Sequence, residues 1–169
     1  MKSHRKRVFA ATGMAAVAGL VTTALIVMPA LATPASGETP RLLAPVGHFG
    51  EINAKAKSGD WEAEIETKGL TDVHVVEVTL QPGGYLGWHS HPGPRFLIVK
   101  SGTATNYRAD DPTCTPQVLP AGSSLFEPAG DVHNLRNEGS EPLVYVTVQL
   151  VAAGAPRRID EPSPGNCPF

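Results

Sequence analysis

Beyond residue 40, the hydrophobic and polar positions of the chain follow the two-residue period of β-strands. Between Trp61 and Thr67, apolar residues alternate with glutamates, which predicts a strand with one solvated face. Runs rich in Val, Ile, Thr, Tyr and Leu predict further strands at residues 73–80, 95–100, 117–119, 123–126 and 143–151. Turns rich in Gly and Pro separate these runs, and no long 3.6-residue apolar period follows residue 41. The pattern predicts an all-β sandwich or barrel.

The first 32 residues differ from the rest of the chain in charge and hydropathy. Four of the 14 basic residues lie within the first seven positions, and an apolar run from Val8 to Leu31 follows them. This order, which ends in Ala30-Leu31-Ala32, is typical of a signal peptide, so we expect export and cleavage near Ala32. The alternative is an uncleaved membrane anchor, because about 20 apolar residues can span a bilayer. The sequence thus predicts a secreted or otherwise extracytoplasmic protein.

Composition divides the remaining chain into three parts. Residues 33–40 have the composition of a mobile linker, residues 41–151 hold the predicted strands, and residues 152–169 form a Pro-rich tail. Past Ala32 there are 10 basic and 16 acidic residues and no basic block, so the features of a nucleic-acid-binding protein are missing. In an oxidising compartment, we expect Cys114 and Cys167 to form a disulfide that attaches the tail. Two reactive thiols would need a basic or helix-terminal setting that neither cysteine has.

Histidines give the main chemical signal. His89 and His91 are two positions apart, so in an extended segment both imidazoles leave the same face and can bind one ion. Such a pair is by itself a weak indication of a metal site, because short motifs often occur by chance. A second cluster follows about 30 residues later, and it consists of Gly122, Pro128, Gly130, His133 and Asn137.

The two clusters together resemble the paired motifs of the cupin superfamily. The first motif contains Gly83, His89, His91 and Gly102, and the second cluster matches the other motif at every defining position. The resemblance covers about residues 60–150. It implies a double-stranded β-helix barrel, a relative of the jelly roll, in which His89, His91 and His133 bind a divalent Fe, Mn, Ni, Cu or Zn ion. Three neutral imidazoles leave coordination positions open, as in catalytic or ligand-binding sites.

Arg95 departs from the family pattern, because the superfamily has a glutamate there as a fourth ligand. An arginine about 5 Å from a divalent ion would be repelled by about 7 kcal/mol at an effective dielectric constant near 20. Three outcomes relieve this repulsion: Arg95 turns outward or pairs with a local acid, the barrel holds no metal, or an anionic substrate group lies between the charges. Alternation places Arg95 on the face of Leu97 and Val99, which favours an inward side chain.

Other candidate residues have less support. Tyr85 and Trp88 flank the first motif, where they either line the mouth of the pocket and contact substrate or simply pack. Asp131 is either an alternative carboxylate for the metal or an ordinary turn residue. We expect His74 to be a packed or edge residue of a strand and His48 to lie in a loop. The chain has no nucleophile elbow, phosphate loop or CxxC metal pair.

Two classes of function remain open for the predicted barrel. In the first, the protein is an oxidoreductase, because a three-His site without the glutamate is most similar to that of cupin dioxygenases, and Arg95 would bind a small anionic substrate. In the second, it is an exported, non-catalytic module that binds or senses a small anion or sugar. The superfamily often forms homodimers through an edge strand, so a homodimer is a further expectation. Contact with a membrane is expected only if the N-terminal segment is retained.

Overall fold

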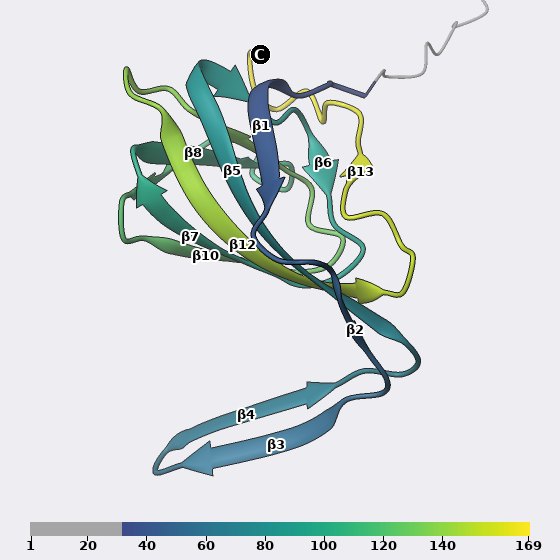
Figure 1. The fold of residues 1–169 in the computed structure, drawn as a ribbon. Helices are drawn as coiled ribbons and strands as arrows, with labels where there is room; N and C mark the ends of the chain where they lie inside the picture. The colour runs from purple at the N-terminus through teal and green to yellow at the C-terminus, as the bar shows by residue number, and fades with distance from the viewer. Residues whose placement is uncertain (1–31) are drawn as a thin grey trace, which may run out of the picture.

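Every regular element between Ala32 and Phe169 is a β-strand, as the two-residue period predicts (Figure 1). This computed structural model describes residues 32–169, so the expected signal peptide and its alternative, a membrane anchor, lie outside the described residues apart from Ala32. Among the described residues, no helix is long and apolar enough to cross a membrane.

Eleven strands form one antiparallel sheet that curls into a barrel (Figure 1). Its main path runs β10-β7-β12-β5-β11-β6-β13, with β1 and β2 paired to β5, β8 to β11, and β9 to β8. The strands are β1 (Ser36–Leu42), β2 (Gly47–Phe49), β5 (Thr71–Tyr85), β6 (His89–Ser90), β7 (Arg95–Ser101), β8 (Thr103–Arg108), β9 (Gln117–Pro120), β10 (Ser124–Glu127), β11 (His133–Arg136), β12 (Leu143–Ala152) and β13 (Ile159–Asp160). This arrangement confirms the predicted all-β barrel of the jelly-roll type.

The barrel interior has an apolar half and a polar half. Alternate residues of β12 face inward, and they change from apolar Leu143 and Tyr145 to polar Thr147 and Gln149 along the strand. The neighbouring strand β7 changes in the same direction, with Val99 opposite Tyr145 and Arg95 opposite Gln149. The apolar half is the hydrophobic core, which consists of Val76, Val78, Leu80, Leu86, Leu97, Val99, Ala104, Leu119, Leu135, Leu143 and Tyr145. The core supports a buried polar compartment at the other end of the same strands.

Residues 33–40 were expected to form a mobile linker, but most of them belong to strand β1. Ser36–Leu42 pairs with β5 along most of its length, and Thr33 accepts a hydrogen bond from the backbone N–H of Trp88 through its hydroxyl, at 2.7 Å. A segment rich in Pro, Gly and Ser is flexible only where its backbone finds no hydrogen-bond partners in the rest of the fold. Here the edge of β5 offers backbone donors and acceptors that the segment satisfies.

The Pro-rich tail is also part of the fold. We call residues 155–169 the C-terminal strap, because they lie across β6 and pair with it through β13. Cys114 and Cys167 form a disulfide, with Cα atoms 5.3 Å apart. Next to it, the Asn166 side chain donates to the carbonyls of Arg108 and Asp111 at 2.9 and 2.6 Å. The end of the chain is therefore attached both to β8 and to the loop that follows it.

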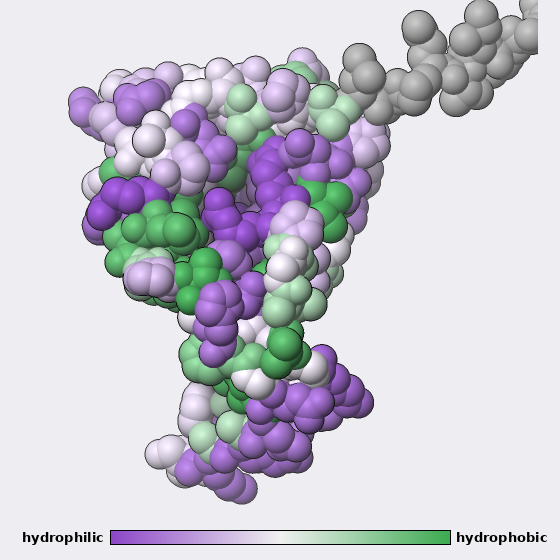
Figure 2. All heavy atoms as spheres, turned by 45° about the vertical axis from the view of Figure 1, so that its right-hand side comes forward, coloured by the Kyte–Doolittle hydropathy of each residue, from purple (hydrophilic) through white to green (hydrophobic). Residues whose placement is uncertain are grey.

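A two-stranded hairpin, β3 (Asn53–Ser58) and β4 (Trp61–Glu66), projects from the barrel as a separate, largely hydrophilic unit (Figure 2). The predicted alternation on β4 is present, but its apolar face is not buried. Trp61 is 60% exposed and Ile65 is 50% exposed. Strand β3 offers only small side chains opposite this face, Ala54 across from Ile65 among them, so the hairpin has no core of its own.

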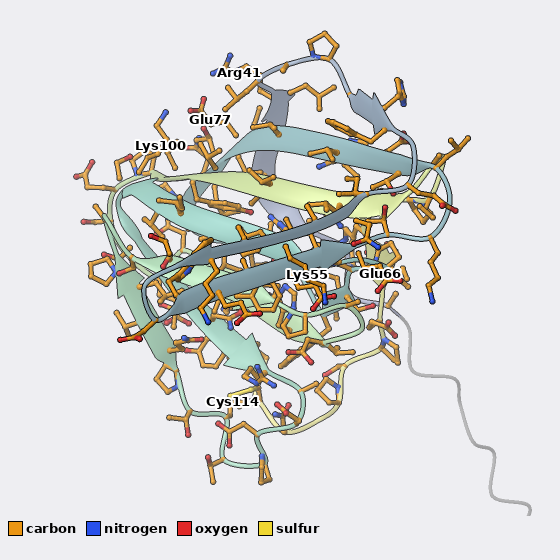
Figure 3. The ribbon with its side chains drawn as sticks, turned by 90° about the horizontal axis from the view of Figure 1, so that it is seen from below. Arg41, Lys55, Glu66, Glu77, Lys100 and Cys114 are labelled. Carbon is orange, nitrogen blue, oxygen red and sulfur yellow. A yellow bond between two sulfur atoms is a disulfide. The ribbon has the colours of Figure 1, made fainter. Side chains whose placement is uncertain are left out.

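An ion-pair cluster ties strands together on the outside of the barrel (Figure 3). Glu77 of β5 bonds to Arg41 of β1 at 2.6 Å and also to Lys100 of β7. The two cations lower the pKa of Glu77, mainly through the hydrogen bond from Lys100. The cluster lies on the outer face, so it is separate from the polar compartment inside.

Gly93, in the loop after the first histidine pair, lies directly against β12. A Cβ atom at this position would be only 1.9 Å from the carbonyl oxygen of Leu150. We expect Gly93→Ala to lower the free energy of unfolding by about 2 kcal/mol, because one of the two backbones must move. Denaturant unfolding measures this loss. Gly50→Ala is the matched control, because no atom of residues 32–169 lies within 4 Å of its added Cβ. Equal stability of the two variants would contradict the expected clash.

Candidate metal centre

The three predicted histidines converge in the polar half of the barrel. His89 lies on β6 directly opposite His133 on β11, and His91 follows β6 two residues later. Their candidate ligand atoms all lie within 4.8 Å of one another, and each side chain is almost fully buried. The local cause is the extended backbone at residues 89–91, which turns both imidazoles to the same face. The pairing of β6 with β11 then places the ring of His133 beside them.

Hydrogen bonds at the far side of each ring set the tautomers. Each Nδ1 atom contacts a backbone carbonyl, and because a carbonyl can only accept, Nδ1 carries the proton. The Nε2 atoms then carry the lone pairs that metal ligation requires. The carbonyls that accept from His89, His91 and His133 belong to Gly87, Arg157 and Asp131, at 2.9, 2.7 and 3.0 Å.

Burial keeps the three rings neutral near pH 7. It lowers the pKa of His91 to about 3 and the pKa of His89 well below its usual range. Burial also lowers the pKa of His133, although the Glu127 carboxylate acts in the opposite direction. Neutral imidazole is the form that binds metals, so protons do not compete for these ligands at neutral pH.

Arg95 is buried among the histidines. Its side chain points inward with Leu97 and Val99, and only 6% of the residue is exposed. The Nη1 atom donates to Nε2 of His91 at 2.7 Å, and the Nε atom lies 3.3 Å from Oε2 of Glu127. Of the ways to relieve repulsion between Arg95 and a metal, the structure shows pairing with a local acid inside the barrel, and the side chain does not turn outward.

Glu127 is the residue at this site that the sequence reasoning missed. Its carboxylate is buried, with Oε1 at 3.4 Å from Nε2 of His133 and Oε2 at 3.5 Å from Nε2 of His91. The same alternation that turned Arg95 inward could have found it, because Glu127 shares a strand face with the partly buried Leu125. Its position opposite Arg95 comes from the register of β10 against β7.

Unsatisfied acceptors show that the residues fit a cation. Among the described residues, the buried Nε2 of His133 has no hydrogen-bond partner, and the buried Oε2 of Glu127 has none besides its ion pair with Arg95 at 3.3 Å. A buried acceptor without a partner costs about 1–3 kcal/mol, so such atoms are rarely left in this state. A divalent transition metal bound by imidazole nitrogens would use these lone pairs. Within the described part of the chain, His89, His91 and His133 form a three-residue group that could hold an ion.

Tyr85 and Trp88 border a different space from the one between the histidines. They line a pocket of 240 Å³ together with Arg136 and Phe169. Arg136 lies over the rings of both Tyr85 and Phe169, with its guanidinium carbon 5.2 and 4.0 Å from their centroids. Trp88 itself is fully buried. Trp88 directly precedes His89 in the sequence, so the pocket and the three-His group share this segment of the chain.

The remaining candidates lie away from the three rings. The carboxylate of Asp131 pairs with Arg108 at 3.2 Å. The backbone carbonyl of Asp131, not its side chain, accepts the hydrogen bond from His133. His48 lies in the short strand β2, not in the expected loop, and contacts Asp72 at 2.7 Å. His74 is a partly buried residue of β5.

Access to the site is narrow. The pocket that reaches His133 and Glu127 has a volume of only 10 Å³, about the room that one water molecule needs. The C-terminal strap covers the opposite side, where Arg157 accepts from His91 and Glu161 accepts from the Ser90 hydroxyl at 2.7 Å. In this conformation, the pocket beside His133 and Glu127 admits only a very small molecule.

Comparison with known protein families identifies the part of the chain that holds both histidine motifs. Residues 76–149 match the cupin domain family. None of the curated proteins matches the chain in sequence. The polyketide cyclase RemF from Streptomyces resistomycificus has a similar fold, with 15% identity, 78% of each chain covered and a TM-score of 0.52.

Two further solved structures are more distant in shape. A cupin-like protein from Thermotoga maritima is 24% identical over 57% of this chain and 79% of its own, with a TM-score of 0.46. The DMSP lyase DddQ from Ruegeria pomeroyi is 20% identical over 52% of this chain, with a TM-score of 0.45. The chain spans only 42% of the length of that lyase. The family match and both histidine motifs lie in the same barrel, so residues 76–149 of this chain form a cupin domain.

Proposed function

We propose that this protein is an exported, metal-dependent oxidoreductase of the dioxygenase-like type, with His89, His91 and His133 as ligands of a divalent transition metal. The observation that carries the proposal is the convergence of three buried, neutral imidazoles on one point. A redox-active metal bound by three imidazoles supplies open coordination positions and electron-transfer chemistry. The disulfide between Cys114 and Cys167 supports export, because such bonds persist in oxidising compartments.

The residues of the chain have separate tasks in this proposal. Backbone carbonyls hold each ring by its Nδ1 proton, which fixes the direction of the Nε2 lone pair. The barrel wall and the C-terminal strap bury the three rings, and the pocket beside His133 and Glu127 leaves room for about one water molecule. Arg95 already has Glu127 as its anion, so an anionic substrate group would have to compete with that carboxylate. The narrow access favours a small reacting group over a large one.

A second candidate function is a non-catalytic binding or sensing module. The observation that favours it is the enclosure of the site, since the 10 Å³ pocket at Glu127 and His133 leaves little room for a substrate. In this alternative the barrel holds a metal, or a small anion or sugar, without turning it over.

Metal analysis and oxygen uptake together test the proposal. We expect protein purified without chelators to contain about one equivalent of Fe, Mn, Ni, Cu or Zn by elemental analysis. Reconstituted with Fe²⁺, it should consume O₂ in the presence of a member of a panel of small phenols, thiols and carboxylic acids. Protein stripped with a chelator is the control. A stoichiometric metal without O₂ consumption would support the binding module, and a folded protein that binds no metal would refute both metal-dependent forms.

A further inference from the structure

We propose that Glu127 is a fourth protein ligand of the metal and that Arg95 is its counter-ion. The inference rests on the metal site proposed above and specifies its ligand set. It explains how a barrel with an arginine in place of the superfamily's glutamate can still hold a divalent cation. The carboxylate comes from the second motif, on β10, and β10 pairs directly with β7, the strand of the first motif that carries Arg95.

Distances support ligation by Glu127. Metal–ligand bonds of about 2.0–2.2 Å place neighbouring ligand atoms about 2.8–3.1 Å apart in octahedral sites and about 3.3–3.6 Å apart in tetrahedral sites. The two carboxylate oxygens lie 3.4 and 3.5 Å from the Nε2 atoms of His133 and His91. Since both Nδ1 atoms carry the ring protons, each of these contacts brings two acceptors together. Such contacts are favourable when a cation lies between them.

Charge gives an independent argument. A carboxylate at 3.3 Å neutralises Arg95, so an incoming divalent ion meets a neutral pair instead of a lone guanidinium. The register of β10 and β7 places Glu127 directly across from Arg95. A carboxylate at residue 127 can therefore reach the part of the interior that residue 95 faces. Both side chains are buried, so solvent screens their interaction with the ion only weakly.

Arg95 and the metal compete for one ligand. Nη1 of Arg95 holds the lone pair of His91 Nε2 at 2.7 Å, and a metal has to take over that lone pair. The two neighbours therefore act in opposite directions. Removal of the Arg95 charge should strengthen metal binding, and removal of the Glu127 charge should weaken it.

A purely structural role for Glu127 makes a different prediction. If Glu127 only neutralises a buried arginine, Glu127→Gln harms the site by leaving Arg95 unpaired, and removal of both charges repairs it. If Glu127 is a ligand, removal of both charges leaves the metal without its carboxylate. The double variant Arg95→Gln/Glu127→Gln separates the two roles, and it carries no unpaired buried charge that would prevent folding.

The experiment is a titration of metal-free protein with Co²⁺, followed by visible absorption and by calorimetry. We expect Arg95→Gln to bind Co²⁺ at least about 10-fold more tightly than wild type. The double variant should bind it at least about 10-fold more weakly than Arg95→Gln, with a changed Co²⁺ absorption band because an oxygen ligand is lost. Glu77→Gln, which removes an ion-paired carboxylate from the outer face, is the control and should bind like wild type.

Two results would overturn the inference in distinguishable ways. If the double variant binds Co²⁺ as tightly as Arg95→Gln with the same spectrum, Glu127 is not a ligand, while the three-His site stands. If folded wild-type protein binds no Co²⁺, the proposed function fails as well. Thermal unfolding of each variant, measured without metal, shows that the folds are intact.

Discussion

Replacement of any one of His89, His91 and His133 by alanine is expected to abolish metal binding at micromolar metal concentrations. Changes in residues that merely orient a ligand cost about 10–100-fold in metal affinity, so loss of a ligand itself should cost about 100-fold or more. Burial lowers the pKa values of all three rings, so at neutral pH protons do not compete with the metal for them. Titration against a chromophoric chelator measures the loss directly.

The chain provides a matched control for these variants. His48 lies on β2, where its ring contacts Asp72 and lies outside the three-His group. His48→Ala should therefore keep wild-type metal affinity. Metal should also raise the thermal midpoint of His48→Ala as it does that of wild type, because a ligand that binds only the folded state stabilises it. A ring whose replacement leaves both readouts unchanged is not a ligand.

Loss of the disulfide is expected to have the largest effect on stability. The two cysteines are 53 positions apart, and closure of a loop of that length contributes about 4 kcal/mol in the chain-entropy model. Cys114→Ser/Cys167→Ser should lower the free energy of unfolding by about that amount. Urea denaturation of the double variant and of oxidised wild type measures the difference.

The same variant should also weaken the metal site. The disulfide holds the C-terminal strap, and the strap supplies the Arg157 carbonyl that orients His91. We expect a loss of about 10-fold in metal affinity, the usual effect of disturbing an outer partner of a ligand. Wild type treated with a reductant should behave in the same way. If stability falls but metal affinity does not, the strap holds the chain end without positioning His91.

The strands that the sequence predicted correctly are those whose neighbours reinforce a local pattern. β5, β7 and β12 are long and alternate clearly, so the period of two is visible in the sequence and matches their buried faces. Strand β1 has linker composition and was missed, because its order depends on the edge of β5. The hairpin shows the opposite case: β4 alternates clearly, but its apolar face is exposed among the described residues.

The sequence by itself determined the histidine site, because its main elements are local. His89 and His91 share a face through strand geometry, and the spacing of the second motif identified His133. Alternation also indicated that Arg95 faces inward, as it does in the structure. The shared faces need only the backbone period, and the assignment of His133 rests on the resemblance to the cupin motifs.

The tertiary structure alone decided what surrounds those rings. Glu127 meets Arg95 because β10 and β7 pair in one register, and His91 meets the Arg157 carbonyl across 66 residues of sequence. Neither contact has a local signature, since strand register and the path of the strap come from packing of the whole barrel. The sequence left open whether Arg95 pairs with a local acid, and the structure identifies that acid as Glu127.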